Sequence, residues 1–266
     1  MKKIFLSADI EGTCGIIHWD ETEKTKADYA PYARQMTREV AAACEGALAG
    51  GADEVLVKDA HDSARNIEAE QLPRRTLLLR GWAQDLCSMM VGLTAAHEGA
   101  IFTGYHSAAG IDGNPLSHTM NTRNVWVKIN GELASELHIN ALYAATLGVP
   151  ILMVAGDKAL CDWIKAVNPN VLTVPVKEGI GRASLSIHPD EAVERIRKTA
   201  EKAMALDPVQ CMFPLPEHFT AEICFREHAS ARNARLYPGV VQTDSRTVKF
   251  ESDDYTEVLR FFYFCL

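Results

Sequence analysis

The pattern that most limits the fold lies in the first 60 residues: a short apolar run, a helical stretch and a second apolar run. Residues 3–6 and 53–58 are predicted to be buried strands. Between them, apolar side chains recur at helical spacing over residues 36–47, and Gly50 and Gly51 end that stretch. A strand–helix–strand unit makes its two strands parallel, with a right-handed connection. The sequence therefore predicts a parallel sheet with helices packed on it.

Acidic and histidine residues stand just after both predicted strands. Asp9 and Glu11 follow the first strand, and Asp59 and His61 follow the second. In an open parallel sheet, the carboxyl ends of the strands form the edge where ligands bind. Two buried carboxylates on one side of a chain repel each other unless a cation lies between them. The pattern indicates a metal or catalytic site, and the alternative is a solvated turn with helix-capping acids.

The next part of the chain continues the alternation of strands and helices. A strand is also predicted at residues 99–105. It is the third strand that is followed by a residue type able to bind metal, since His106 comes directly after it. His106 begins a long loop that contains His118. Glu136 lies near the start of a helix predicted at 133–147, where negative charge is favoured. Further strands are predicted at 76–79, 125–129, 149–157 and 171–176, and further helices at 82–91 and 159–167.

The regular alternation of predicted strands and helices ends near residue 189. A charged amphipathic helix is predicted at 190–206, followed by strands at 222–225 and 247–250 and a helix at 255–265. We predict an α/β protein with a three-layer α/β/α domain and a mainly parallel sheet. Residues 1–188 are the expected metal-binding catalytic domain. Residues 189–266 are expected to form a smaller C-terminal α+β domain with a role in oligomerisation or in forming a channel.

Composition narrows the class of function. The net charge of −8 leaves no basic excess to neutralise nucleic-acid phosphates. No apolar stretch is long enough to span a bilayer, and the N-terminus lacks a signal-peptide pattern. The seven cysteines are scattered and never form a CxxC, which argues against a disulfide framework or a thiolate zinc site. We expect a cytoplasmic protein with no nucleic-acid or membrane partner.

The candidate metal ligands have side chains of the types that bind cations, and most of them follow predicted strands. They are Asp9, Glu11, Asp59, His61, His106, His118 and Glu136. Taken singly, each can be a hydrogen-bonded structural residue or a helix cap. Together they converge on one sheet edge, and mixed histidine and carboxylate ligation suits zinc, manganese or iron. The number of ligands fits two metals with a bridging carboxylate better than one tetrahedral zinc, and such pairs activate water for hydrolysis.

Several segments together resemble the zinc-dependent D-aminopeptidases associated with dipeptide-transport operons (the DppA-type peptidases). They occur in the order of that family and span roughly residues 1–190. These segments are residues 7–12 (SADIEG), 59–61 (DAH), 104–106 (GYH), 117–120 (SHTM), 135–137 (SEL) with Asn140 and Ala141, and 149–157 (VPILMVAGD).

The resemblance implies a dinuclear zinc aminopeptidase that removes the N-terminal residue, a D-alanine-like amino acid, from short peptides. Asp9 would bridge the two zinc ions. Glu11 and His61 would complete one site, and His106 and Glu136 would complete the other. The resemblance also implies a ring-like homo-decamer that encloses its active sites and admits only short peptides.

In the same comparison His118 would be the catalytic group beside the metals. It can serve as base, as acid for the leaving amine or as oxyanion donor, and a direct nucleophilic role is less economical. We expect Asp59 to orient His61 or a neighbouring loop and Asn140 to support Glu136 from one helical turn away. The alternatives are a metallo-amidohydrolase for L-peptides or other small amides, a phosphoesterase or deacylase, and a metal-containing small-peptide binding protein.

Overall fold

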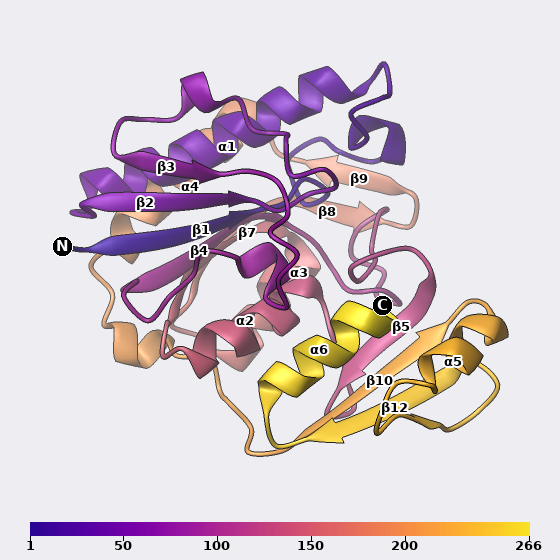
Figure 1. The fold of residues 1–266 in the computed structure, drawn as a ribbon. Helices are drawn as coiled ribbons and strands as arrows, with labels where there is room; N and C mark the ends of the chain where they lie inside the picture. Colours follow the sequence, from indigo (N-terminus) through magenta and orange to yellow (C-terminus); the bar gives the residue numbers. More distant parts are fainter.

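The computed structural model describes residues 1–266 and contains two β-sheets (Figure 1). The larger sheet has, in spatial order, β3 (Thr76–Leu79), β2 (Glu54–Asp59), β1 (Lys3–Ala8), β4 (Gly99–Tyr105), β7 (Ile151–Asp157), β8 (Leu172–Ile180) and β9 (Ala183–Ser186). All neighbours pair in parallel except β8 and β9. The predicted parallel pairing of the first two strands is confirmed, with Ala8 opposite Asp59.

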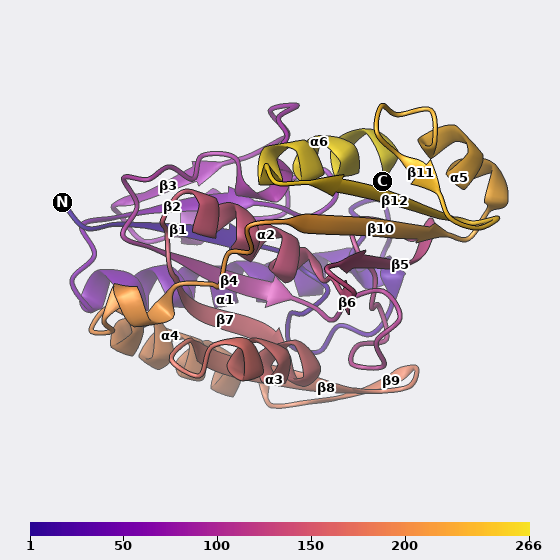
Figure 2. The ribbon, with the colours of Figure 1, turned by 90° about the horizontal axis from the view of Figure 1, so that it is seen from below.

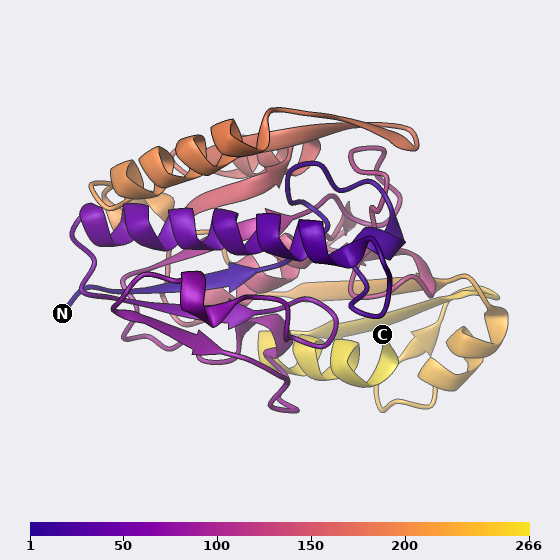
Figure 3. The same ribbon diagram turned by 90° about the horizontal axis from the view of Figure 1, so that it is seen from above.

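Helices cover both faces of the larger sheet. On one face α1 (Tyr29–Ala49) and α4 (Pro189–Ala203) lie side by side, as Figure 3 shows. On the other face lie α2 (Glu136–Thr146) and α3 (Lys158–Val167). Side chains alternate along each strand, so Ile4 and Leu6 pack under α1 while Phe5 packs on the α2 side. The predicted three-layer α/β/α architecture with a mainly parallel sheet is confirmed.

The second sheet is antiparallel and lies beyond α2 (Figure 2). Its spatial order is β11 (Val241–Gln242), β12 (Thr247–Ser252), β10 (Phe219–Phe225), β5 (Asn124–Ile129) and β6 (Glu132–Leu133). Two helices accompany it, α5 (His228–Ala234) and α6 (Tyr255–Cys265), and α6 packs on α2. One apolar cluster joins Phe102 of the larger sheet, Leu137 of α2 and Phe261 of α6, so the two sheets share a core.

The predicted domain boundary at residue 188 stays a prediction, and the two sheets draw elements from both sides of it. β5 and β6 precede residue 188 and pair with each other, but β5 also pairs with the C-terminal β10. α4 follows residue 188 but packs on α1 at the far face of the larger sheet.

None of the helices combines the length and the apolar character needed to cross a bilayer.

Three local predictions differ from the structure. The helix expected at 82–91 is only a 3-10 turn, Ser88–Met90, because Gln84 and Ser88 adopt left-handed φ values of 57° and 46°. The helix expected from residue 133 begins at Glu136, since Ser135 is its N-cap and accepts a hydrogen bond from the His138 amide. Helix α5 and the β8–β9 hairpin were not predicted.

The strand order of the larger sheet reverses at one point, between β1 and β4. The chain runs from β1 outward through β2 to β3, then returns to β4 on the other side of β1 and continues outward to β7 and β8. The order therefore reverses between β1 and β4. In open α/β sheets ligands bind at such a switch point, beside the carboxyl ends of the strands.

Candidate metal centre

The carboxyl ends of β1, β2 and β4 each deliver a candidate ligand to the switch point. Asp9 follows β1 directly, His61 lies two residues beyond β2, and His106 follows β4 directly. Glu136 comes from the opposite direction as the first residue of α2. The parallel register of the three strands places these side chains at one edge of the sheet.

Gly104 allows the chain segments after β1 and β4 to approach each other. Its φ is +68°, and a Cβ at this position would lie 2.0 Å from the backbone oxygen of Asp9. The Gly104 carbonyl in turn accepts a hydrogen bond of 2.7 Å from the Gly12 amide. Only glycine combines this backbone conformation with so close an approach.

Asp9 lies between two histidines. Its Oδ1 is 3.3 Å from Nδ1 of His61, and its Oδ2 is 3.4 Å from Nε2 of His106. Oε2 of Glu11 is 3.2 Å from the same Nδ1 of His61. The two oxygens of the Asp9 carboxylate thus face different partners, as a bridging carboxylate must.

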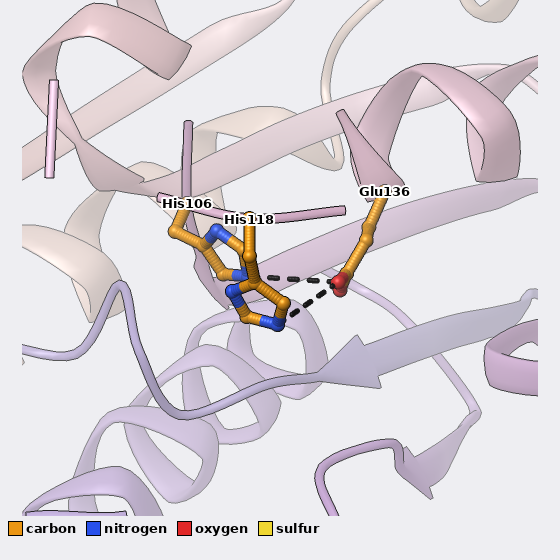
Figure 4. Close-up of side chains that lie close together, drawn as sticks. All are labelled: His106, His118 and Glu136. Carbon is orange, nitrogen blue, oxygen red and sulfur yellow. Dashed lines mark ion pairs between the residues drawn. The ribbon is translucent and has the colours of Figure 1, made fainter. Parts of the chain in front are cut away.

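Figure 4 shows the second group, in which His106, His118 and Glu136 point toward one another. Oε1 of Glu136 is 3.7 Å from Nε2 of His106 and 3.4 Å from Nε2 of His118. The two imidazole rings stack with centroids 4.3 Å apart. The same Glu136 oxygen accepts the Met120 amide at 2.7 Å, which fixes the carboxylate.

Each of the three imidazoles has one nitrogen bonded to a backbone carbonyl. Nε2 of His61 lies 2.9 Å from the Thr22 oxygen, Nδ1 of His106 lies 3.0 Å from the Ser107 oxygen, and Nδ1 of His118 lies 2.8 Å from the Leu116 oxygen. A carbonyl only accepts, so these nitrogens donate their protons. The other nitrogen of each neutral ring then presents a lone pair to the carboxylates, the arrangement usual for histidines that ligate metals.

Buried polar atoms without partners indicate that a cation fits this centre. Oδ2 of Asp9, Oε2 of Glu11 and Nε2 of His106 are buried and have no hydrogen-bond partner. Groups of this kind are costly unless something compensates them. Carboxylate oxygens and bare imidazole nitrogens are ligands for divalent transition metals. The five predicted ligands Asp9, Glu11, His61, His106 and Glu136 are therefore chemically suited to hold metal ions, and each is more than nine-tenths buried.

The electrostatics of the metal-free cluster support this conclusion. Burial raises the pKa of Asp9 well above its usual range, and the charge of Glu11 adds to the effect. Burial opposes the charge of His61, yet the Glu11 and Asp9 carboxylates outweigh it and hold the pKa of His61 well above its usual value. Burial and the neighbouring His118 lower the pKa of His106. Without a metal the cluster therefore retains protons that a cation would displace.

The two predicted supporting residues have different roles in the structure. The Asp59 carboxylate accepts the Asn66 amide at 2.6 Å and the Ile67 amide at 2.9 Å, and Asn66 Nδ2 donates to the His61 oxygen at 2.7 Å. Asp59 thus holds the loop of His61, and its role behind a metal-binding His61 stays a prediction. The expected support of Glu136 by Asn140 is wrong, because Asn140 Nδ2 donates to the Tyr105 hydroxyl at 3.0 Å.

Sequence reasoning missed two buried supporting residues, Asp157 and Lys177. Asp157, at the end of β7, accepts the amide and hydroxyl of Ser107 at 2.6 and 2.7 Å and so fixes the residue after His106. Its position after a fourth parallel strand was an available signal. Lys177 Nζ donates to the backbone oxygen of Glu11, and to that of Ile16 at 2.8 Å. A lysine within a strand gave no comparable signal.

The centre opens into a cavity of about 590 Å³. Asp9, Glu11, His61, His118 and Glu136 line its floor, and no lysine or arginine lines it. His118 also contacts the indole of Trp19 edge-on, with centroids 5.2 Å apart. The volume falls within the range of small-molecule sites.

A buried histidine–carboxylate centre at the switch point of a three-layer α/β/α fold, open to a peptide-sized cavity, defines a metallohydrolase. Comparison with known proteins then specifies the type. A model of the D-aminopeptidase family, peptidase family M55, matches residues 1–264, and the chain belongs to this family.

Two relatives agree with this assignment. The chain is 33% identical over 258 residues to a D-aminopeptidase of Bacillus subtilis (strain 168), covering 96% of this chain and 93% of the relative. It is also similar to the structure of the Zn-dependent D-aminopeptidase DppA from Bacillus subtilis, described as a self-compartmentalizing protease. That match has a TM-score of 0.90 and 30% identity and covers 98% of this chain and 95% of the other. The predicted family and the metallopeptidase class are confirmed.

Proposed function

We propose that this protein is a zinc aminopeptidase that removes an N-terminal D-amino acid from short peptides, with two zinc ions per chain. The observation that supports it most is the pair of donor groups, Asp9 with Glu11 and His61, and His106 with His118 and Glu136. The zinc dependence of the similar DppA structure agrees with this donor set. Asp9 would hold both ions, since its two oxygens face His61 and His106.

Within this proposal Glu11 and His61 hold one ion, and His106 and Glu136 hold the other. When bound, zinc supplies Lewis acidity that polarises a peptide carbonyl and lowers the pKa of water toward about 7. The backbone bonds of the three histidines keep their inward nitrogens oriented without further reorganisation.

His118 is the proposed catalytic residue. Its Nε2 faces the cavity and Glu136, and its Nδ1 donates to the Leu116 carbonyl. Nε2 can therefore accept a proton from the attacking water and return it to the leaving amine. The side chain is the least buried of the three histidines, at 12% exposure, which gives it access to substrate.

We further propose that the chain forms a homo-oligomer, with the decamer as the expected form. The similar structure is described as self-compartmentalizing, which supports assembly around enclosed sites. Leu236, Val241 and Phe264 are large apolar side chains left exposed within residues 189–266, which supports a role of this part in assembly. Residues 1–188 remain the proposed catalytic part, and the cytoplasmic location stays a prediction.

The test is hydrolysis of paired D-Ala and L-Ala dipeptides and amides by the purified chain, with zinc content measured on the same sample. We expect cleavage of the D-series, loss of activity with a chelator, and recovery at about two zinc ions per chain. Cleavage of the L-substrates alone would contradict the proposed selectivity for D-amino acids. If neither series is cleaved after metal addition, the whole proposal is overturned.

The role of His118 is tested with His118→Ala and a control, His228→Ala, an exposed histidine of α5. We expect His118→Ala to keep both zinc ions and to lose at least about 100-fold in kcat, in line with removal of a proton-transfer group. The control should match the wild type. Loss of one zinc ion in His118→Ala would make His118 a ligand instead of the proton-transfer group.

A further inference from the structure

A second cavity of about 230 Å³ adjoins the metal cavity. Both are lined by Ser88, Met120 and Asn121, so these residues lie at the boundary between the two cavities, which we call the passage. We call the second cavity the apolar annexe; its walls include Leu86, Ile139, Leu259 and Phe262. No charged side chain lines it.

The annexe extends from the Glu136 side of the metal centre. Glu136 begins α2, and Ile139, one turn further along the same helix, lines the annexe. α6 closes the opposite side, since Leu259 and Phe262 belong to it and α6 packs on α2. The passage residue Met120 donates its amide to Glu136 at 2.7 Å, so the opening is fixed beside this carboxylate.

The backbone at the passage is strained. Ser88 and Met120 have left-handed φ values of 46° and 65°, although neither is glycine. Such conformations are unfavourable by roughly 1–3 kcal/mol each and persist where the surrounding structure imposes them, often at ligand sites. Their coincidence at one opening indicates a shaped passage and not an accidental gap.

Another part of the metal-cavity wall is acidic. Glu23 and Asp62 line it, and they are the cavity carboxylates outside the two donor groups. They follow Thr22 and His61, which are joined by the hydrogen bond between His61 Nε2 and the Thr22 oxygen. The cavity therefore has an acidic end on the His61 side and an apolar end on the Glu136 side. A peptide ammonium is favoured at the first end and an apolar side chain at the second.

We propose that the annexe is a specificity subsite that receives the side chain of the residue after the scissile bond, and that it selects apolar residues there. This inference rests on the proposed function. The ammonium of the first residue lies toward Glu23 and Asp62, so the leaving residue lies toward the passage. An apolar side chain that enters the annexe leaves water for a mainly apolar wall, whose one charged group is the C-terminal carboxylate of Leu266, bonded to Asn121 and Arg123.

The test uses the zinc-loaded enzyme and D-alanyl dipeptide amides whose second residue is glycine, leucine or phenylalanine in either configuration. We expect kcat/KM to be about 10-fold or more higher for leucine than for glycine, as burial of such a side chain permits. Leu259→Phe narrows the annexe and should reduce this ratio, whereas Phe262→Ala widens it and should raise the phenylalanine-to-glycine ratio. Thr256→Ala, an exposed residue of the same helix that lines neither cavity, is the control and should change neither ratio.

The ratios separate a subsite from a structural effect, because a general loss of folding lowers kcat/KM for all substrates together. Phe262 is buried, so its variant is checked by urea unfolding, and Leu259→Phe tests the proposal independently. Equal rates for leucine and glycine in the wild type, or ratios that stay unchanged in both variants, would overturn the proposal. The proposal would also be overturned if these variants changed the preference for the first residue of the peptide instead of the second. If no peptide is cleaved at all, the proposed function fails instead.

Discussion

Replacing Asp59 by asparagine tests whether one buried carboxylate holds the loop that positions His61. Asp59 is fully buried at the end of β2. Its Oδ2 accepts the amides of Asn66 and Ile67 at 2.6 and 2.9 Å, and its Oδ1 accepts Asn66 Nδ2 at 2.8 Å. The Asn66 side chain then donates to the His61 carbonyl at 2.7 Å.

The size of the effect follows from these bonds. Asparagine offers one acceptor oxygen, so its NH₂ group must face either the two backbone amides or the Asn66 side chain. With the NH₂ toward the amides, two charge-assisted bonds are lost and two buried donors are left unpaired. The opposite orientation loses only the bond from Asn66 Nδ2 and is therefore preferred, so at about 1.5–3 kcal/mol for a bond to a charged group Asp59→Asn should lower the free energy of unfolding by roughly 1.5–3 kcal/mol. Zinc affinity at the His61 site should fall by about 10–100-fold.

Two measurements check this prediction. Competition with a chromophoric chelator should remove one zinc ion from Asp59→Asn at a chelator concentration that leaves the wild type loaded. Urea unfolding of the metal-free proteins gives the difference in stability. The control is Asp162→Asn, an exposed carboxylate paired with Lys158 at 2.7 Å, which should cost less than about 1 kcal/mol. Equal zinc affinity and equal stability of Asp59→Asn and wild type would refute the reasoning.

Three further predictions concern the backbone contact, a buried acid and metal binding. Gly104→Ala places a Cβ 2.0 Å from the backbone oxygen of Asp9 at a φ of +68°. It should therefore lower the free energy of unfolding by at least about 2 kcal/mol, measured by thermal unfolding. It should also reduce the zinc content, measured by metal analysis. Burial raises the pKa of Glu39 to about 7, so only the folded state keeps this proton between pH 4.5 and 7. Relative to Glu39→Gln, the free energy of unfolding of the wild type should therefore fall by about 3 kcal/mol across that window, in urea titrations of both proteins at each pH. Zinc must displace the proton that the carboxylates hold on metal-free His61, so zinc affinity should rise with pH, and calorimetry in two buffers should detect proton release; pH-independent affinity would contradict this.

The positions of the candidate ligands were predictable because they depend on local sequence and on simple sheet geometry. An apolar run followed by Asp9, and others followed by His61 and His106, identify strand ends, and parallel strands bring such ends to one edge. Glu136 was predictable from the helix it begins, although Ser135 set the start of that helix three residues later than expected.

The supporting contacts were less predictable. Asp59 was expected to act behind His61 because it shares the same strand end. Asn140 was assigned to Glu136 from helical spacing alone, but its donor goes to Tyr105 of β4, 35 residues away. Helical spacing determines which side chains share a face and not which neighbour across the interface offers the better acceptor.

The sequence alone determined the strand ends, the ligand types and the parallel sheet, because strand periodicity and connection handedness act within a few tens of residues. The tertiary structure decided what lies around them. Lys177 reaches the backbone of Glu11 across 166 residues, β5 pairs with the distant β10 as well as with its neighbour β6, and α6 closes the apolar annexe against α2. Such pairings depend on competing burial and hydrogen bonding among distant segments, which local patterns do not encode.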